Sequence, residues 1–344
     1  MFVAVMKLLY IWGKFYNNMK RKIFFTVVFC VCGLLVGCHQ SEEMEFVDVN
    51  LKMSVVASIE GSNNDVTSRY GGDNPNSVLF KSGDALGMAV NDGGFVQWNK
   101  DETGDGWSPV GNSVYWSDKS NEHSFIAFYP YVSNATAESV PMPDLSDQDG
   151  TMQSVAEKDF LVAKKTQTYG NNGTVTFTGN EAFSHVSSLV VLTLKGGGDL
   201  TSAIVNKISI SGENLTTSST FSFDGNCAVT LSDSEKNILE ITPDYAVSSN
   251  DKIFYFVLNA STVGLSEVTL TIDYTIDGTK FKAEKVGIHL TEEDMFLRGN
   301  QYAYTVTIVD NTLKISGHEI KPWVSGASLG DIVINGEIVG GGQS

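Results

Sequence analysis

Few residues of this chain combine the types and the spacing that metal binding or catalysis requires. Its five histidines show no ligand spacing with one another or with Cys227. Acidic stretches at residues 101–105 and 144–149 weakly suggest calcium loops, but neither has the EF-hand spacing or its closing glutamate. No nucleophile elbow, phosphate loop or dinucleotide-binding fingerprint occurs. The sequence therefore predicts no metal site, no cofactor and no enzymatic activity.

The sequence that precedes one cysteine predicts that this residue is covalently modified. A basic cluster at residues 20–22 precedes an apolar run at residues 23–36, which is typical of a secretory signal and too short for a permanent membrane helix. The small pair Val36-Gly37 directly before Cys38 resembles a bacterial lipobox, in which the cysteine is acylated and becomes the first mature residue. The resemblance implies a lipid anchor at Cys38, outside the cytoplasm. The alternatives are an ordinary secretory signal or a core helix.

The flanks of this signal carry two further predictions. Met19 directly precedes the basic cluster, so we expect translation to start there rather than at Met1, although a long basic leader is the alternative. The acidic patch at residues 41–45 resembles the surface-export signal of Bacteroidetes lipoproteins. A solvated linker is the alternative for that patch.

The charge balance excludes one class of partner. The formal net charge of the chain is −17, and residues 1–38 carry basic groups but no acid, so the remainder is more negative still. Nucleic-acid binding needs clustered lysine and arginine, so we expect no nucleic-acid partner. Cys30 and Cys32 leave with the signal, which leaves Cys227 without an intrachain disulfide partner once Cys38 is acylated. The mature chain must therefore be held together by its hydrophobic core.

The first element that could position any site is a strand. Apolar residues alternate with polar ones over residues 47–59, with Val56 as the one exception. A period of two is typical of a half-buried strand. The predicted inward face consists of Val47, Val49, Leu51, Met53, Val55, Ala57 and Ile59.

The rest of the chain is a succession of short apolar segments separated by Gly, Asn and Asp, with no long amphipathic helix. The clearest turn is Asp277-Gly278, which predicts a tight hairpin after an alternating strand at residues 268–276. Glycines 196–198 predict a domain boundary. We therefore expect an all-β protein with an extension and signal at residues 1–38 and two β-sandwich domains, at residues 39–198 and 199–344. The other predicted strands are at residues 85–90, 114–116, 124–129, 159–163, 174–177, 187–194, 205–210, 220–223, 228–231, 238–241, 252–258 and 302–308.

Several segments together resemble the fimbrillin-like proteins of Bacteroidetes, which are the subunits of type V pili. The matching segments are residues 80–87, 115–116, 125–130, 159–163, 183–188, 299–304 and 320–323. The resemblance implies two transthyretin-like β-sandwich domains and a structural subunit of cell-surface fimbriae that supports adhesion. It also implies a lipoprotein of the outer membrane whose partners are other fimbrial subunits, itself or paralogues.

The family resemblance further implies activation by proteolysis, in which an arginine-specific protease removes the N-terminal strand. Carried onto this sequence, residues 47–59 are the removable strand, and the cut falls between Arg69 and Tyr70, in a polar segment. A strand from a neighbouring subunit would then fill the opened groove. The alternative is a permanent first strand followed by a solvated arginine.

The C-terminal tail, residues 324–344, is the candidate donor strand. Ile332, Ile334 and Ile338 share one face of it, interrupted by Gly336. The alternative is a hairpin that turns at Asn335-Gly336 and closes its own domain. In that case the protein would be a cap, tip or accessory subunit.

Aromatic residues suggest a second function. Trp98 and Trp107 lie in a polar stretch at residues 91–111, where exposed rings would stack on sugars. Trp116 and Tyr129 are instead expected in the first core. The alternative function is therefore a monomeric surface lipoprotein that binds glycans or other host or bacterial surface ligands.

Overall fold

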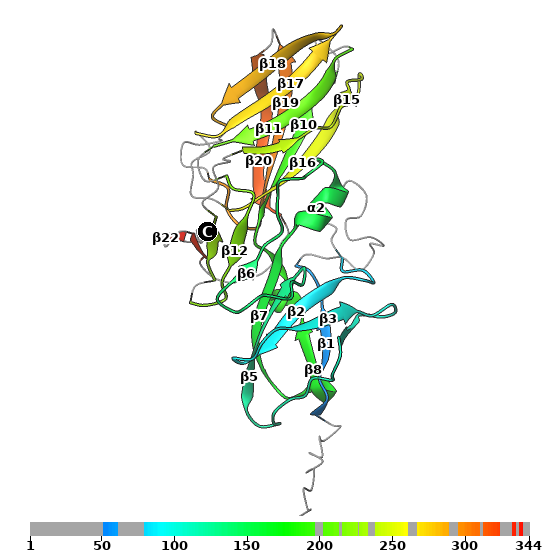
Figure 1. Ribbon diagram of the computed structural model, residues 1–344, viewed down its shortest axis with the longest axis vertical. Helices are drawn as coiled ribbons and strands as arrows, with labels where there is room; N and C mark the ends of the chain where they lie inside the picture. The colour runs from blue at the N-terminus through cyan, green and yellow to red at the C-terminus, as the bar shows by residue number, and fades with distance from the viewer. Residues whose placement is uncertain are drawn as a thin grey trace, which may run out of the picture. The chain divides into compact units, whose positions relative to one another are not determined.

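Strands form almost all of the regular structure (Figure 1). The computed structural model describes residues 51–60, 79–196, 202–212, 215–225, 227–232, 238–260, 267–288, 295–309, 312–323, 332–334 and 337–339. All of these belong to the unit Asn50–Ser344. The prediction of an all-β fold is confirmed, whereas the transthyretin-like topology stays a prediction.

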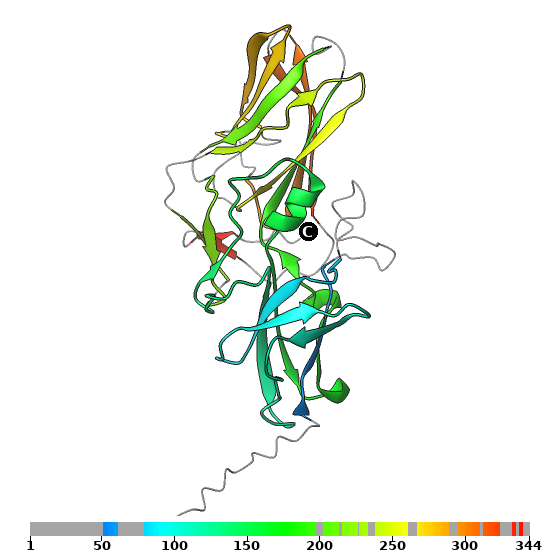
Figure 2. The same ribbon diagram turned by 45° about the vertical axis from the view of Figure 1, so that its right-hand side comes forward.

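The first sheet has eight strands in the order β8-β1-β4-β3-β2-β5-β7-β9. Its N-terminal strand, β1, lies inside the sheet between β8 and β4, and Figure 2 shows the blue β1 running beside the green β8. The strands are β1 (Ser54–Ala57), β2 (Ala85–Val90), β3 (Val96–Lys100), β4 (Gly106–Pro109), β5 (Glu122–Tyr129), β7 (Leu161–Thr168), β8 (Thr174–Phe177) and β9 (Ser184–His185).

Two further sheets use the second half of the chain. One has the order β16-β10-β19-β20, and the other has the order β14-β11-β17-β18, with β15 also paired to β11. Their strands are β10 (Ser188–Leu194), β11 (Ile204–Ser211), β14 (Ile238–Ile241), β15 (Tyr245–Ala246), β16 (Lys252–Leu258), β17 (Thr269–Ile276), β18 (Thr279–Val286), β19 (Asn300–Val309) and β20 (Thr312–Pro322). Strand β10 precedes the domain boundary predicted at residues 198/199 and pairs with β16 and β19. That division stays a prediction.

A small sheet of short strands has the order β22-β21-β13-β12-β6. Its strands are β6 (Val140–Pro141), β12 (Ser219–Phe221), β13 (Val229–Leu231), β21 (Ile332–Ile334) and β22 (Glu337–Val339). Among the described residues, the helical elements are α2 (Met152–Lys158), η2 (Asn171–Gly173) and η3 (Gly179–Glu181). Helix α2 begins where the Thr151 side chain accepts a hydrogen bond from the Ser154 backbone N–H. In the described part of the chain, no helix has the length and apolar character needed to cross a membrane.

The hairpin predicted at Asp277-Gly278 is confirmed. Strands β17 and β18 pair without a register shift from Thr269↔Val286 to Ile276↔Thr279. Both turn residues have a positive φ, 49° for Asp277 and 79° for Gly278. This is the backbone that a two-residue turn needs to match the twist of its strands.

Buried side chains from the first three sheets belong to one hydrophobic cluster. Leu86 and Phe125 come from the first sheet, Val190 and Tyr302 from the second, and Ile272 from the third, and none is more than 1% exposed. Each such side chain contributes about 1.5–3 kcal/mol by leaving water. The expectation that the chain is stabilised by its apolar core agrees with this packing.

Replacing Gly278 by alanine should destabilise the protein by about 1 kcal/mol, because a side chain disfavours the positive φ of this turn. A Cβ atom there would meet nothing within 4 Å, so the cost is conformational and not steric. Gly94 has equal space around it and no positive φ, and Gly94→Ala is the matched control. Urea denaturation measures both; equal midpoints for the two variants would contradict the prediction.

Candidate functional site

Strand β1 is hydrogen-bonded along both edges. It pairs in parallel with β8, where Val55 lies opposite Val175, and antiparallel with β4, where Val55 lies opposite Trp107. The backbone pairing continues beyond the strand, because the Glu60 N–H donates to the Phe183 carbonyl at 2.8 Å. Taking β1 away would leave two unpaired strand edges facing each other.

The buried face of β1 is the one predicted from the alternation. Met53, Val55 and Ile59 are at most 1% exposed and Ala57 is 7% exposed, whereas Ser54 is exposed. These four side chains belong to the same hydrophobic cluster as residues of the flanking strands. The space that β1 fills is therefore an apolar groove. The predicted residues Val47 and Val49 lie outside the described residues, and Leu51 packs against the cluster from a partly buried position.

The walls of this groove are aromatic. Phe80 contacts Trp107 edge to face, with ring centroids 5.0 Å apart, and contacts Phe183 at 5.4 Å. Phe177, which lies opposite Ala57, contacts Phe183 at 5.5 Å. Aromatic pairs of this kind add stability beyond their buried area, so the walls are held together when β1 is in place.

The expectation that Trp98 and Trp107 stack on sugars is wrong. The two indoles are 0% and 2% exposed. The polar stretch that holds them forms the antiparallel pair β3–β4, with Trp98 opposite Pro109. Alternation within this pair turns both rings inward, so neither offers a face to a ligand. The alternation of side chains in each short strand was the signal that could have predicted the burial of these rings. It was hard to recognise among the surrounding polar residues.

Trp116 and Tyr129 are buried, as predicted. Trp116 is 2% exposed and its Nε1–H donates to the Gly173 carbonyl at 2.9 Å. Tyr129 is 8% exposed and its hydroxyl donates to Asp84 Oδ1 at 3.0 Å. Both rings therefore have the hydrogen bonds that a buried polar aromatic residue needs.

A polar cluster lies at the end of the β1 groove, and sequence analysis missed most of it. His185 Nδ1 lies 2.9 Å from Asp159 Oδ1, and the His185 ring stacks on Trp323 with centroids 4.1 Å apart. Arg298 donates from Nε to the His185 carbonyl and from Nη2 to the Ser184 hydroxyl, both at 3.1 Å. Asp159 and His185 are at most 2% exposed. His185 is thus a buried, hydrogen-bonded histidine, as expected for a structural role.

Glu60 is the acidic residue of β1's own segment at this end of the groove. The residue is 9% exposed. Burial raises the pKa of its carboxyl above the usual 4.5, while the nearby His185 and Arg298 act in the opposite direction. Burial likewise lowers the pKa of the Arg298 guanidinium to about 10, against the opposing influence of Cys227 and Glu60. The buried Glu60 and the half-buried Arg298 therefore influence each other's pKa at the end of the groove.

The C-terminal tail forms a hairpin in the structure. Strands β21 and β22 pair antiparallel from Ile332↔Val339 to Ile334↔Glu337, and β21 contacts β13 in parallel at Val229↔Ile334. Donation of this tail to another copy stays a hypothesis. The predicted residues Cys38, Arg69 and Tyr70 lie outside the described residues.

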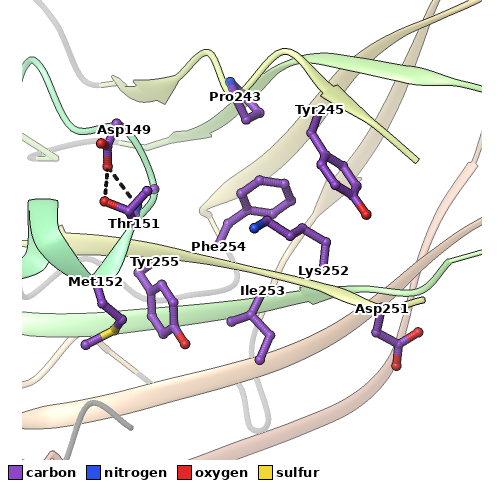
Figure 3. Close-up of a pocket in the computed structure, with 11 residues that line it drawn as sticks. Asp149, Thr151, Met152, Pro243, Tyr245, Asp251, Lys252, Ile253, Phe254 and Tyr255 are labelled. Carbon is purple, nitrogen blue, oxygen red and sulfur yellow. Dashed lines mark hydrogen bonds between the residues drawn. The ribbon is translucent and has the colours of Figure 1, made fainter. Parts of the chain in front are cut away.

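A surface pocket of about 520 Å³ lies between the start of α2 and strands β15 and β16 (Figure 3). Its charged groups already have protein partners. Asp149 accepts hydrogen bonds from Thr151 N and Oγ1, Asp251 pairs with Lys195 at 2.6 Å, and Lys252 lies over the Tyr245 ring. The described residues contain no group of three or more potential metal ligands.

Comparison with known proteins identifies the family. The chain has the all-β architecture of fimbrial and cell adhesion proteins, and the model of the Fimbrillin-like family matches residues 77–323. The chain belongs to the fimbrillin-like family. The matched region excludes both β1 and the C-terminal tail.

Individual relatives agree with this assignment. Fim1C of Bacteroides uniformis, a candidate fimbrium subunit, is 23% identical over 269 residues, which is 73% of this chain and 81% of the relative. A candidate cell adhesion protein of Bacteroides ovatus superposes with a TM-score of 0.58 at 17% identity, covering 80% of this chain and 98% of that one. Another from Bacteroides uniformis has a TM-score of 0.53 at 18% identity, covering 79% and 97%. These two structures support the fold.

Trp98→Ala should destabilise the protein by about 3–5 kcal/mol, because it empties a fully buried site. Tyr115→Ala, at a 37% exposed aromatic residue, is the control and should cost much less. Chemical denaturation measures both variants. Retention of full stability by Trp98→Ala, together with loss of binding to a glycan array, would restore the sugar-stacking hypothesis.

The stability of the native protein should fall, relative to Glu60→Gln, as the pH rises upward from about 4.5. The folded state holds the Glu60 proton more tightly than the unfolded chain does, because burial raises the pKa of this carboxyl. Unfolding therefore becomes more favourable between the two pKa values. Glutamine stays neutral and removes this contribution. Urea denaturation at a series of pH values measures the difference, and a constant difference would contradict the prediction.

Proposed function

We propose that this chain is a subunit of cell-surface fimbriae whose lipid-anchored precursor matures by losing β1 and that then assembles by accepting a strand from another subunit. The observation that carries the proposal is the position of β1: an N-terminal strand lies inside a sheet, with both edges paired and its apolar face buried. The family assignment to fimbrial and adhesion proteins supports the biological setting. Acylation of Cys38 would anchor the precursor in the outer membrane until the cut after Arg69 releases it.

A groove emptied of β1 would favour the binding of another strand. Removal of β1 would expose the unpaired backbone groups of β8 and β4 together with the apolar walls around Phe177 and Phe183. Exposed edges and apolar patches of this kind promote association with another strand. Main-chain hydrogen bonds would supply affinity, and alternate side chains would supply specificity.

The distribution of arginines supports a specific cut. The arginines of the chain are Arg21, Arg69 and Arg298. Arg21 lies in the predicted signal, and the Arg298 guanidinium is hydrogen-bonded to Ser184 and His185. A protease specific for arginine would therefore act at Arg69 and release everything before Tyr70, β1 included.

A second candidate is an accessory, tip or anchor subunit that uses its tail in cis. The observation that favours it is the pairing of β21 with β22 and β13. A tail used in this way is not offered to a neighbour. Such a subunit would still accept a strand in its own groove, so both candidates share the first half of the mechanism.

Treating the full chain with an arginine-specific protease should produce a new N-terminus at Tyr70 and species that migrate as a ladder on gels without strong heating. Intact mass and N-terminal sequencing identify the cut. Arg69→Lys keeps the charge but removes the recognition site, so it should remain uncut and unpolymerised. Cleavage at Tyr70 without any change in assembly state, alone or mixed with other subunits, would overturn the exchange mechanism.

A further inference from the structure

Strand β16 lies at an edge of its sheet, because β10 is the one strand that pairs with it among the described residues. Successive residues of such a strand direct their N–H and C=O groups alternately toward the paired strand and away from it. The Tyr255 N–H points away from β10, since it donates to the Gly150 carbonyl at 3.0 Å. Ile253 lies two residues earlier, so its N–H and C=O groups also point away from β10. These outward groups form a row with which a further strand can pair.

Part of this row is already covered by a strand-like segment of the same chain. The Gln148 side-chain amide bonds both backbone groups of Val257, because Oε1 accepts from the N–H at 2.6 Å and Nε2 donates to the carbonyl at 2.9 Å. Gly150 bonds the next outward residue, Tyr255, so the segment runs antiparallel to β16. The chain then leaves the edge where helix α2 begins. Amide groups thus bind this edge in the structure itself, and they stop before they reach Ile253.

The pocket of about 520 Å³ lies at the end of the row that this segment leaves uncovered (Figure 3). Among the described residues, no group is hydrogen-bonded to the outward N–H and C=O of Ile253, and the residue is 38% exposed. Figure 3 shows Ile253 and Tyr255 on one side of β16 and Phe254 on the other, as alternation along a strand requires. An exposed apolar residue on an unpaired strand edge favours association with another strand.

A lysine precedes the uncovered residue of the edge. Lys252 Nζ lies 5.7 Å from the centroid of the Tyr245 ring and 6.0 Å from that of the Phe254 ring. These rings hold the ammonium group at the pocket wall. The acidic residue next to it, Asp251, pairs instead with Lys195 at 2.6 Å, and no other carboxylate pairs with Lys252 in the described part of the chain. The pocket therefore has a cation without an acidic partner beside an unpaired backbone edge.

We propose that the uncovered end of β16 binds an extended segment of another protein chain, which adds to the sheet as an antiparallel strand. The residue of that segment that pairs with Ile253 is apolar, because its side chain lies beside the exposed isoleucine. The following residue is acidic, because an antiparallel strand places it opposite Lys252. This surface is separate from the β1 groove, so the inference goes beyond the proposed function and does not require the removal of β1.

The two parts of this contact have different effects. Main-chain hydrogen bonds to Ile253 supply affinity for any extended segment, and the side chains select among segments. Opposite charges that face each other across two strands are stabilising, whereas like charges are destabilising, so Lys252 discriminates against a basic residue at the facing position. Because residues 148–150 cover the rest of the edge, the added strand is short and its binding is weak and reversible.

Binding of a short peptide to the full, uncut chain tests the proposal. The probe is a fluorescent peptide of residues 308–312 with blocked ends, in which Val309 precedes Asp310. The folded chain holds its own copy of Val309 in β19. Hydrogen exchange should slow at the Ile253 N–H when the peptide binds and stay unchanged at Phe254, whose N–H faces β10. A peptide that does not bind, or that binds without protecting Ile253, would overturn the inference.

A charge exchange tests the role of the lysine. Asp310→Lys in the peptide should weaken binding by about fivefold, as measured by fluorescence anisotropy, because like charges then face each other. Lys252→Glu in the protein should reverse the preference, so that the Asp310→Lys peptide binds better than the native one. Lys280→Glu is the matched control, at an exposed lysine of the edge strand β18, and should leave the preference unchanged. A preference that Lys252→Glu does not alter would contradict the proposed register.

Proline substitution tests the backbone pairing. Ile253→Pro removes the outward N–H without breaking a bond to β10, and edge strands tolerate proline at such positions. It should weaken peptide binding at least about tenfold, whereas Ile253→Val should bind normally. If Ile253→Pro does not fold, Val309→Pro in the peptide removes the opposing donor and should have the same effect. Undiminished binding with either proline would refute strand addition.

The oligomeric state of the chain alone distinguishes the remaining occupant. Sedimentation velocity should show that the uncut chain does not associate through β16. Dimers that disappear in Ile253→Pro, without any binding of the peptide, would assign this edge to a second copy of the chain and overturn the inference.

Discussion

The pairing of β1 along both of its edges is the constraint on which the first sheet depends. An edge strand can detach and leave the rest of a sheet intact. An interior strand cannot, because its loss separates β8 from β4 and opens the core beneath them. The four buried side chains of this segment account for the contact with the core, and the backbone bonds from Met53 to Glu60 fix its register. The first sheet is therefore stable only while a strand occupies the groove.

A cluster of polar and charged residues lies at one end of this groove. It joins residues of four distant segments, since Glu60 ends the β1 segment, Asp159 follows α2, His185 belongs to β9 and Arg298 precedes β19. Buried charges are costly, and a groove lined only by apolar side chains would be simpler and no less stable. Their presence at one end distinguishes the two ends of an otherwise uniform apolar groove.

Patterns of neighbouring residues in the sequence correctly predicted two local features of the structure. The period of two over residues 47–59 identified the buried face of β1, and Asp277-Gly278 identified the β17–β18 turn, because both depend on neighbouring residues alone. Trp98 and Trp107 were misjudged because their strands, of five and four residues, are surrounded by polar turns and carry too few alternations to be recognised. The proximity of the Glu60 segment to the residues that bind Arg298 could not be inferred at all. Nothing in a sequence relates two residues so far apart until strand pairing brings the segments together.

The parallel pairing of β1 with β8 also has a consequence for the order of folding. Ser54 and its partner Thr174 are 120 residues apart, so this contact closes a very large loop. Contacts of such high sequence separation form slowly, because the entropy of loop closure must be lost before they stabilise anything. Strand β1, the first strand in the described part of the chain, is therefore expected to be among the last to dock. Until β1 docks, a strand from another chain can compete for its place in the sheet. The β1 segment is favoured in that competition by the high effective concentration that its covalent tether provides.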